Sequence, residues 1–290
     1  MRSVIVVETG PLATIQDLGR PGYAHLGVPR SGGADRGSMT LANRLVGNPE
    51  SAATIETTLG GLRIRARETL FVVVTGADAP VTVDGTPIGV GAAVALPDGT
   101  ELVIRTPTRG LRNYVAVRGG FDVLPVLGSR STDTLSGLGP TPLAAQHELT
   151  VRDAESPWPA TTSAPVSAFS ESIVTLEITD GPRGDRVRAV RDLMRDRWTV
   201  SPDSNRVGVR IARPEGSTEP LIAHLENIDQ LASEGIATGA VQVPPSGRPV
   251  LFGADHPVTG GYPVVAVLTP ASIDRAAQLA PGTLVRFRGS

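Results

Sequence analysis

Residues 70–75 read Leu-Phe-Val-Val-Val-Thr, an almost unbroken run of apolar and β-branched side chains. A strand with one face in water alternates apolar and polar residues, whereas a strand covered on both faces is apolar throughout. We therefore expect residues 70–75 to form a strand that is covered on both faces.

Short runs of similar composition recur along the whole chain, and Gly, Pro, Asp or Asn brackets most of them. This spacing predicts a mainly β chain built of closed barrels or sandwiches, which leave few free strand edges. The other runs expected to be strands are 3–7, 101–105, 111–117, 173–178, 207–211, 250–253, 264–268 and 283–287.

A segment rich in Pro, Ala, Ser and Thr divides the 290 residues. It has no helical or strand period and is typical of a linker. The chain is long enough for two medium-sized domains. We expect an N-terminal domain over 1–153, a linker over 154–170 and a C-terminal domain over 171–290.

Three segments carry helical signals. Asp35 can cap a helix over 36–46, which the following glycine and proline would end. Residues 185–198 place apolar side chains on one helical face. A third short helix is expected after Pro270.

Charge and composition exclude several classes of protein. The net charge of −2 does not favour nucleic acid or an anionic membrane as a partner. No apolar run is long enough to span a membrane. The chain has no cysteine, which excludes disulfides and thiolate chemistry and fits a reducing cytoplasm. We expect a cytoplasmic protein.

All 27 basic residues are arginine. A phosphate-loop lysine, a Schiff-base lysine and a biotin-carrying lysine are therefore impossible in this chain. The chain contains neither a Gly-x-Ser-x-Gly elbow nor a His-Glu-x-x-His motif. Its four histidines are scattered, so we expect no metal site.

Four patches combine polar residues with glycine more densely than a turn requires, and the patch over 255–263 has the richest chemistry. Its consecutive glycines allow backbone N–H groups to face an anion. His256 is a candidate proton shuttle near neutral pH, with Asp255 beside it. The alternative is a tight turn with an exposed His256. The four patches are 16–22, 29–36, 233–235 with 242–245, and 255–263.

The two N-terminal patches have plainer alternatives. Loop 31–33 leads into a helix N-terminus, a common anion site, but Asp35 would cap that helix and repel an anion. Capping is therefore the favoured interpretation there. Gln16, Asp17 and Arg20 can bind substrate, but the spacing favours the alternative of a charged turn with an internal Asp–Arg ion pair. Glu56 lies in an apolar stretch, where a buried carboxylate is often functional.

The residues from Gly10 to Arg36 closely resemble the start of the biotin-dependent carboxyltransferase-like family. This family includes allophanate hydrolase subunit 2, the C subunit of bacterial 5-oxoprolinase and a protein that antagonises a sporulation-kinase inhibitor. The similarity covers nearly the whole chain in order, and it continues through 41–49, 56–61, 75–78, 114–120, 126–133, 200–208, 233–235, 242–245 and 259–263.

The resemblance implies two cyclophilin-like β-barrels and a partner protein, which is the subunit 1 of allophanate hydrolases or the B-type subunit of 5-oxoprolinases. It implies the C-type subunit of an ATP-dependent 5-oxoprolinase-like amide hydrolase that acts on 5-oxoproline. One alternative is a carboxyltransferase half that acts on urea in the allophanate pathway. The other is a non-enzymatic regulator that binds a kinase inhibitor. ATP with magnesium would be shared with the partner, and biotin would sit only on a separate carrier.

The family pattern also suggests roles for the polar patches. Arg20, Arg36 and the loop over 259–262 would orient carboxylate or phosphate oxygens. The catalytic candidates are Asp35, Glu56 and His256. The substrate-binding candidates are Gln16, Asp17, Arg20, Ser31, Arg36, Asn43, Glu234, Thr259, Gly260, Gly261 and Tyr262. We expect residues 16–35 and 259–263 to line one cleft.

Two positions depart from the family pattern. Val264 stands where the family usually has a lysine, and His256 stands where it usually has an arginine. A carboxyl or phosphate contact by that lysine therefore cannot exist in this chain.

The absence of lysine makes a direct prediction about biotin. Streptavidin blotting of the purified protein should show no signal, because biotin is attached to proteins through a lysine amine and this chain has none. A strong band at the mass of the chain would contradict this prediction.

Overall fold

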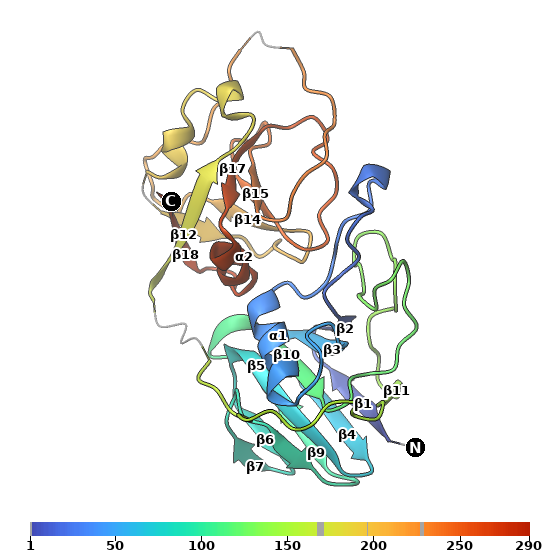
Figure 1. Ribbon diagram of the computed structural model, residues 1–290. Coiled ribbons are helices and arrows are strands. Elements are labelled where there is room, and N and C mark those ends of the chain that lie inside the picture. The colour runs from blue at the N-terminus through green and yellow to red at the C-terminus, as the bar shows by residue number, and fades with distance from the viewer. Residues whose placement is uncertain (1, 167–170, 196, 227–228) are drawn as a thin grey trace. The chain divides into compact units, whose positions relative to one another are not determined.

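The computed structural model describes residues 2–166, 171–195, 197–226 and 229–290 of the chain, and these form two compact units. The first unit contains residues 1–20 and 31–170. The second contains residues 171–290 together with the segment 21–30. Most elements of both units are strands (Figure 1), so the mainly β prediction is confirmed.

The strands of the first unit form two sheets that share one apolar core. The larger sheet has the order β11-β1-β4-β9-β6-β7, and the smaller has the order β2-β3-β10-β5-β8. In the larger sheet the strands are β1 (Ser3–Thr9), β4 (Leu62–Arg67), β6 (Val81–Val83), β7 (Thr86–Ile88), β9 (Glu101–Ile104) and β11 (Glu148–Thr150). In the smaller sheet they are β2 (Leu12–Gln16), β3 (Thr54–Thr58), β5 (Leu70–Asp78), β8 (Val94–Leu96) and β10 (Arg109–Val117).

Strand β5 is covered on both faces, as its composition predicts. Val72 and Val74 point into the core between the two sheets. Val73, on the opposite face, packs with Met39 and Ala42 of helix α1 (Arg36–Leu45), which lies over β5 and β10 (Figure 1). A polar side chain at any of these three positions would be buried.

Helix α1 begins where the sequence predicts. The carboxylate of Asp35 accepts a hydrogen bond from the backbone N–H of Ser38 at 2.9 Å, so Asp35 is the N-cap. Gly47 follows the helix with a φ of 69°, a left-handed conformation that glycine adopts without strain.

The second unit is a closed barrel with the strand order β12-β17-β15-β16-β14-β13-β18. The barrel closes through a parallel pairing of β12 with β18, while its other neighbouring strands pair antiparallel. Its strands are β12 (Ile173–Asp180), β13 (Trp198–Val200), β14 (Gly208–Ala212), β15 (Ala240–Gln242), β16 (Val250–Phe252), β17 (Val264–Leu268) and β18 (Leu284–Gly289).

The expected helix over 185–198 is wrong. Two short 3₁₀ turns, η2 (Gly184–Arg186) and η3 (Val190–Leu193), stand in its place, and Trp198 begins strand β13. Val187 instead forms a β-bridge with His224, and the fully buried Trp198 donates its indole N–H to the carbonyl of Leu193. These tertiary contacts override the helical period. The expected helix after Pro270 is confirmed as α2 (Pro270–Ala277), and the remaining short element is η1 (Ala24–Leu26).

Residues 154–166 of the expected linker pack against the first unit. Trp158 lies edge-on to Phe71, with ring centroids 5.0 Å apart, and Arg118 stacks on its face. Residues 167–170 lie outside the described residues, and the expected domain boundaries stay a prediction. No helix among the described residues is long and apolar enough to cross a membrane.

Two glycines offer a matched test of the packing between turns. Gly10 and Gly99 both have left-handed φ values, 65° and 75°. A Cβ on Gly10 would lie 1.9 Å from the carbonyl oxygen of Gly60, whereas a Cβ on Gly99 would meet nothing within 4 Å.

Gly99→Ala should lower the free energy of unfolding by about 1–2 kcal/mol, the usual cost of a left-handed L-residue. Gly10→Ala should cost clearly more, because the two turns must also separate. Urea unfolding followed by circular dichroism measures both changes. Equal losses in the two variants would contradict the packing described here.

Candidate functional site

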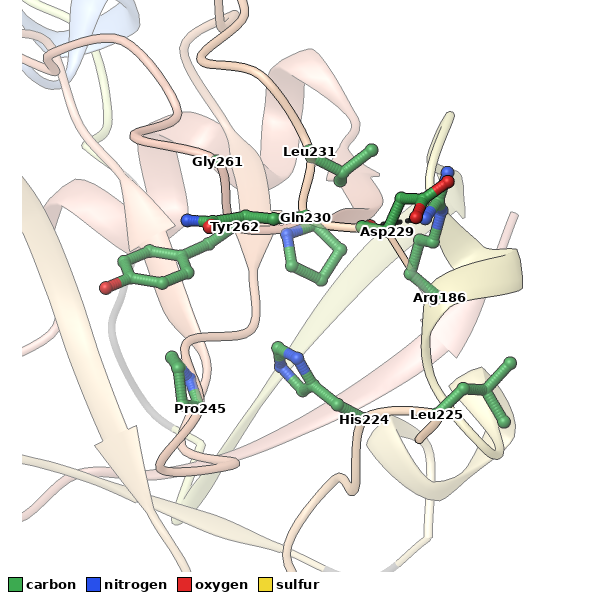
Figure 2. Close-up of a pocket in the computed structure, with 10 residues that line it drawn as sticks. Arg186, His224, Leu225, Asp229, Gln230, Leu231, Pro245, Gly261 and Tyr262 are labelled. Carbon is green, nitrogen blue, oxygen red and sulfur yellow. Dashed lines mark hydrogen bonds between the residues drawn. The ribbon is translucent and has the colours of Figure 1, made fainter. Parts of the chain in front are cut away.

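A pocket of about 260 Å³ opens in the second unit (Figure 2). Polar and apolar side chains from several loops share its wall. Its lining residues are Arg186, His224, Leu225, Asp229, Gln230, Leu231, Pro245, Gly261, Tyr262 and Pro263. Two of the predicted binding residues, Gly261 and Tyr262, are therefore part of a real cavity.

Backbone pairing brings Arg186 and His224 to the same pocket. The N–H of Leu225 donates to the carbonyl of Arg186 at 3.0 Å, and the N–H of Arg188 donates to the carbonyl of Ala223 at 2.9 Å. These two bonds flank the β-bridge between Val187 and His224. The two segments therefore lie side by side although about 35 positions separate them in the chain.

The turn that carries Tyr262 is held by a dense set of hydrogen bonds. The N–H of Glu234 donates to the hydroxyl of Thr259 at 2.7 Å, and the N–H of Thr259 donates to the carbonyl of Glu234 at 2.9 Å. The side chain of Gln242 donates to the carbonyls of Thr259 and Tyr262. The phenol ring of Tyr262 is 41% exposed, so this rigid turn presents it at the rim of the pocket.

The two glycine amides of this turn are already used within the loop. The N–H of Gly260 donates to the hydroxyl of Ser233 at 3.0 Å, and the N–H of Gly261 donates to that of Thr259 at 3.4 Å. Both glycines have left-handed φ values, whereas an anion-binding nest pairs a right-handed residue with a left-handed one. In this conformation the amides hold the turn, and their binding of an anion stays a prediction.

Glu234 forms an ion pair with Arg183 rather than facing the pocket alone. The hydrogen bond from the guanidinium lowers the pKa of Glu234 below its ordinary value. The carboxylate therefore remains ionised and anchors the loop that carries Ser233.

Asp17, in the first unit, is buried and accepts four hydrogen bonds. Its donors are the hydroxyls of Ser129 and Ser131 at 2.6 Å and the backbone N–H groups of Gly19 and Arg130 at 2.8 and 2.6 Å. The alternative of an Asp17–Arg20 ion pair is wrong, because Arg20 donates to the carbonyl of Ser131 instead. Asp17 thus organises the loop around residues 129–131.

Arg20 is only 1% exposed, and its charge has no carboxylate partner among the described residues. Its Nη2 donates to Ser131, but Nε and Nη1 have no hydrogen-bond partner within the described chain. Gln16 lies beside the same segment and donates to the carbonyl of Thr132, as Ser31 does, and its own Oε1 is unpartnered there. Unmet buried polar groups are unusual, which is consistent with the predicted binding roles of Gln16 and Arg20.

Glu56 and Asp35 are joined by the hydroxyl of Tyr114. This hydroxyl accepts from the N–H of Asp35 at 2.8 Å and donates to the carboxylate of Glu56 at 2.9 Å. The same carboxylate accepts from the N–H of Ala34 and lies 3.5 Å from Nε of Arg112. Burial, followed by the charges of Glu56 and Asp35, raises the pKa of Tyr114 well above its ordinary value.

The remaining candidates lie apart from these groups. Asn43 is fully buried and donates to the carbonyls of Glu50 and Ala52, while Arg36 is exposed on the first turn of α1. Nδ1 of His256 lies 3.0 Å from the carbonyl of Pro257, and His256 does not line the pocket. The neighbouring Asp255 accepts two hydrogen bonds from the buried Arg206.

The structure therefore groups the candidates within each unit. Gln16, Asp17, Arg20 and Ser31 meet around residues 129–132, and the 259–262 turn meets Glu234. The single cleft expected to join the two groups stays a prediction, as do the catalytic roles. No cluster of three metal-ligating side chains occurs among the described residues.

Sequence reasoning missed His224, Arg186, Asp229 and Gln230. Arg186 ends a glycine-rich polar run over 181–186, part of which falls in the expected helix, whereas His224 is flanked by Ala223 and Leu225. Their proximity depends on loop pairing between distant segments, which leaves no local pattern.

Comparison with known proteins identifies relatives along nearly the whole chain. A family model described as carboxyltransferase domain, subdomain A and B, matches residues 26–289. The chain is 31% identical to the C subunit of 5-oxoprolinase from Escherichia coli K12, over 97% of this chain and 89% of that protein. It is 30% identical to the protein of the same name from Haemophilus influenzae, with the same coverage.

The chain also matches parts of longer proteins. It is 31% identical to urea amidolyase of Lachancea kluyveri over 97% of this chain, but it spans only 16% of that enzyme. The solved structure of TTHA0988 superposes with a TM-score of 0.88 at 32% identity, covering 99% of this chain and 55% of that one. The urea carboxylase of Kluyveromyces lactis gives the same TM-score at 27% identity, over 98% of this chain and 27% of that one.

The raised pKa of Tyr114 predicts that the free energy of unfolding depends on pH. An unfolded tyrosine loses its proton near pH 10, whereas the folded Tyr114 keeps it to higher pH. Above about pH 10 the folded state therefore binds more protons than the unfolded state, and the free energy of unfolding falls as the pH rises. The chain has no lysine or cysteine, so tyrosines are its only side chains that titrate in this range.

Tyr114→Phe should remove this part of the pH dependence. Near pH 7 it should also lower the free energy of unfolding by about 1–3 kcal/mol, because the buried N–H of Asp35 and the carboxylate of Glu56 lose a partner. Urea unfolding of the variant and the wild type at a series of pH values tests both effects, with Tyr23→Phe as the control for losing one tyrosine. Parallel curves for the wild type and Tyr114→Phe would contradict the network described here.

Proposed function

The chain belongs to the carboxyltransferase family of subdomains A and B, and we propose that it is the C-type subunit of an ATP-dependent 5-oxoprolinase-like hydrolase. The observation that carries this proposal is the extent of the match. The chain corresponds to most of the length of two bacterial 5-oxoprolinase C subunits, but to a small segment of the urea amidolyases. A match to most of a C subunit favours a role as one component of a complex.

The chemistry of the second unit supports an amide substrate. A pocket of about 260 Å³ lies just below the range of about 300–1,000 Å³ that is usual for drug-sized ligands. It is therefore suited to a metabolite such as 5-oxoproline. The chain would contribute binding groups, and its B-type partner would complete the catalytic set.

The residues of this chain do not by themselves suit a magnesium–ATP site. The sequence has no lysine to contact phosphates, and the described residues contain no cluster of three potential metal ligands. The proposal therefore shares the handling of ATP with the partner proteins. ATP bound with the help of the partner proteins would supply the energy for opening the lactam ring.

A second candidate function is a carboxyltransferase half that acts on urea. The matches to urea amidolyase and urea carboxylase favour it. Because this chain has no lysine, the biotin would have to arrive on a separate carrier. Both candidate reactions act on an unreactive amide or urea group.

Turnover by the assembled complex distinguishes the two candidates. We expect the chain to co-purify with its B-type partner. With the third component present, the complex should convert 5-oxoproline and water to glutamate only when ATP is supplied. Omission of this chain should abolish that activity, measured as glutamate release.

A parallel assay with urea and carboxybiotin provides the contrast. Carboxylation of urea without turnover of 5-oxoproline would refute the hydrolase proposal and favour the second candidate. Failure of the chain to associate with the partner in light scattering at micromolar concentration would refute the shared-site arrangement.

A further inference from the structure

The pocket of Figure 2 lies wholly within the second unit and contains polar atoms that the fold leaves unused. Within the described chain, Nδ1 of His224 and Nη2 of Arg186 have no hydrogen-bond partner, and neither has the side-chain amide of Gln230. The hydroxyl of Tyr262 stands at the rim and is likewise unbonded there. These groups are available to a ligand.

The hydrogen bond to Val243 determines what His224 can offer. Nε2 of His224 lies 2.9 Å from the carbonyl oxygen of Val243. A carbonyl only accepts, so Nε2 carries a proton, and in the neutral form of the imidazole Nδ1 is left as an acceptor. The position of Val243 is itself held by its N–H, which donates to the carbonyl of Pro263 on the other side of the pocket.

Arg186 supplies the complementary donor. Its Nη1 donates to the carbonyl of Asp229 at 3.0 Å, and its Nε lies 3.8 Å from the carboxylate of Asp185. These two contacts hold the guanidinium at the wall and leave the N–H groups of Nη2 for a carbonyl oxygen.

The charges around the pocket favour a neutral group over an anion. The positive charges of Arg183 and Arg186 are balanced by the negative charges of Asp185, Asp229 and Glu234. The surroundings of the pocket therefore carry no excess positive charge, and Asp229 would repel a carboxylate placed beside it.

We propose that this pocket binds the planar amide or ureido group of the substrate, with Nδ1 of His224 accepting its N–H and Arg186 donating to its carbonyl oxygen. The inference rests on the proposed function and deepens it, because it names the part of the substrate that this chain recognises. The carboxylate of a substrate such as 5-oxoproline would point away from the pocket.

Two lactams of the same ring size test the proposal on the isolated chain. The probe 2-pyrrolidone has an N–H, and N-methyl-2-pyrrolidone does not. In long-range ¹H–¹⁵N spectra, 2-pyrrolidone should shift the Nδ1 signal of His224 in a saturable way. The affinity for the N-methyl compound should be at least about tenfold lower, as expected for the loss of one hydrogen bond.

Two variants separate ligand binding from a purely structural role of His224. His224→Gln can still donate to the carbonyl of Val243, so its unfolding midpoint should stay close to that of the wild type. Its amide oxygen can also replace Nδ1 as an acceptor, so it should keep the N–H-dependent binding of 2-pyrrolidone, whereas His224→Leu, which has no acceptor, should bind the probe about tenfold more weakly. His25→Gln, at an exposed position, should bind the probe as the wild type does.

Equal binding of the two lactams, no binding of either, or unchanged affinity in His224→Leu would overturn the inference, even if the complex hydrolyses 5-oxoproline. Binding that requires the N–H, in a chain whose complex does not turn over 5-oxoproline, would support the pocket and refute the proposed hydrolase.

Discussion

The first unit depends on the hydroxyl of Tyr114, which lies between a strand carboxylate and the start of a helix. It accepts from the N–H of Asp35 and donates to Glu56, and so it joins β10, β3 and the N-terminus of α1. All three side chains are buried, so water cannot replace a lost partner. Because α1 covers the outer face of β5, the same contact also keeps Val73 out of water.

All side-chain cations other than histidine are arginines, and several of them make contacts that a lysine could not make. Arg206 meets the buried Asp255 with two hydrogen bonds, a geometry that requires the planar guanidinium fork. Arg118 and Arg213 stack on the rings of Trp158 and Trp198. The buried Arg206 is therefore part of the packed interior, while Arg118 and Arg213 are half-buried and cover aromatic rings. Arg20 differs, because its buried charge meets no carboxylate among the described residues.

The candidate site was only partly predictable from the sequence. The density of glycine and polar residues correctly singled out the turn over 259–263, which needs left-handed glycines and borders a pocket. The same signal could not show that the amides of Gly260 and Gly261 already donate within the loop. His224 gave no such signal, because its neighbours in space come from other segments of the chain.

The sequence by itself determined some of the strands, such as β5, and the first helix, because these depend on neighbouring residues. The apolar run over 70–75 implies a strand covered on both faces, and Asp35 caps the helix that it immediately precedes. Only the tertiary structure decided that β12 closes the barrel against β18, more than 100 positions later, and that the described residues of 185–198 form short 3₁₀ turns and the start of β13 instead of an α-helix. It also decided which nitrogen of His224 carries the proton, since that depends on the carbonyl of Val243, 19 positions away. Such outcomes depend on which distant groups meet, and a local pattern of residue types does not encode that.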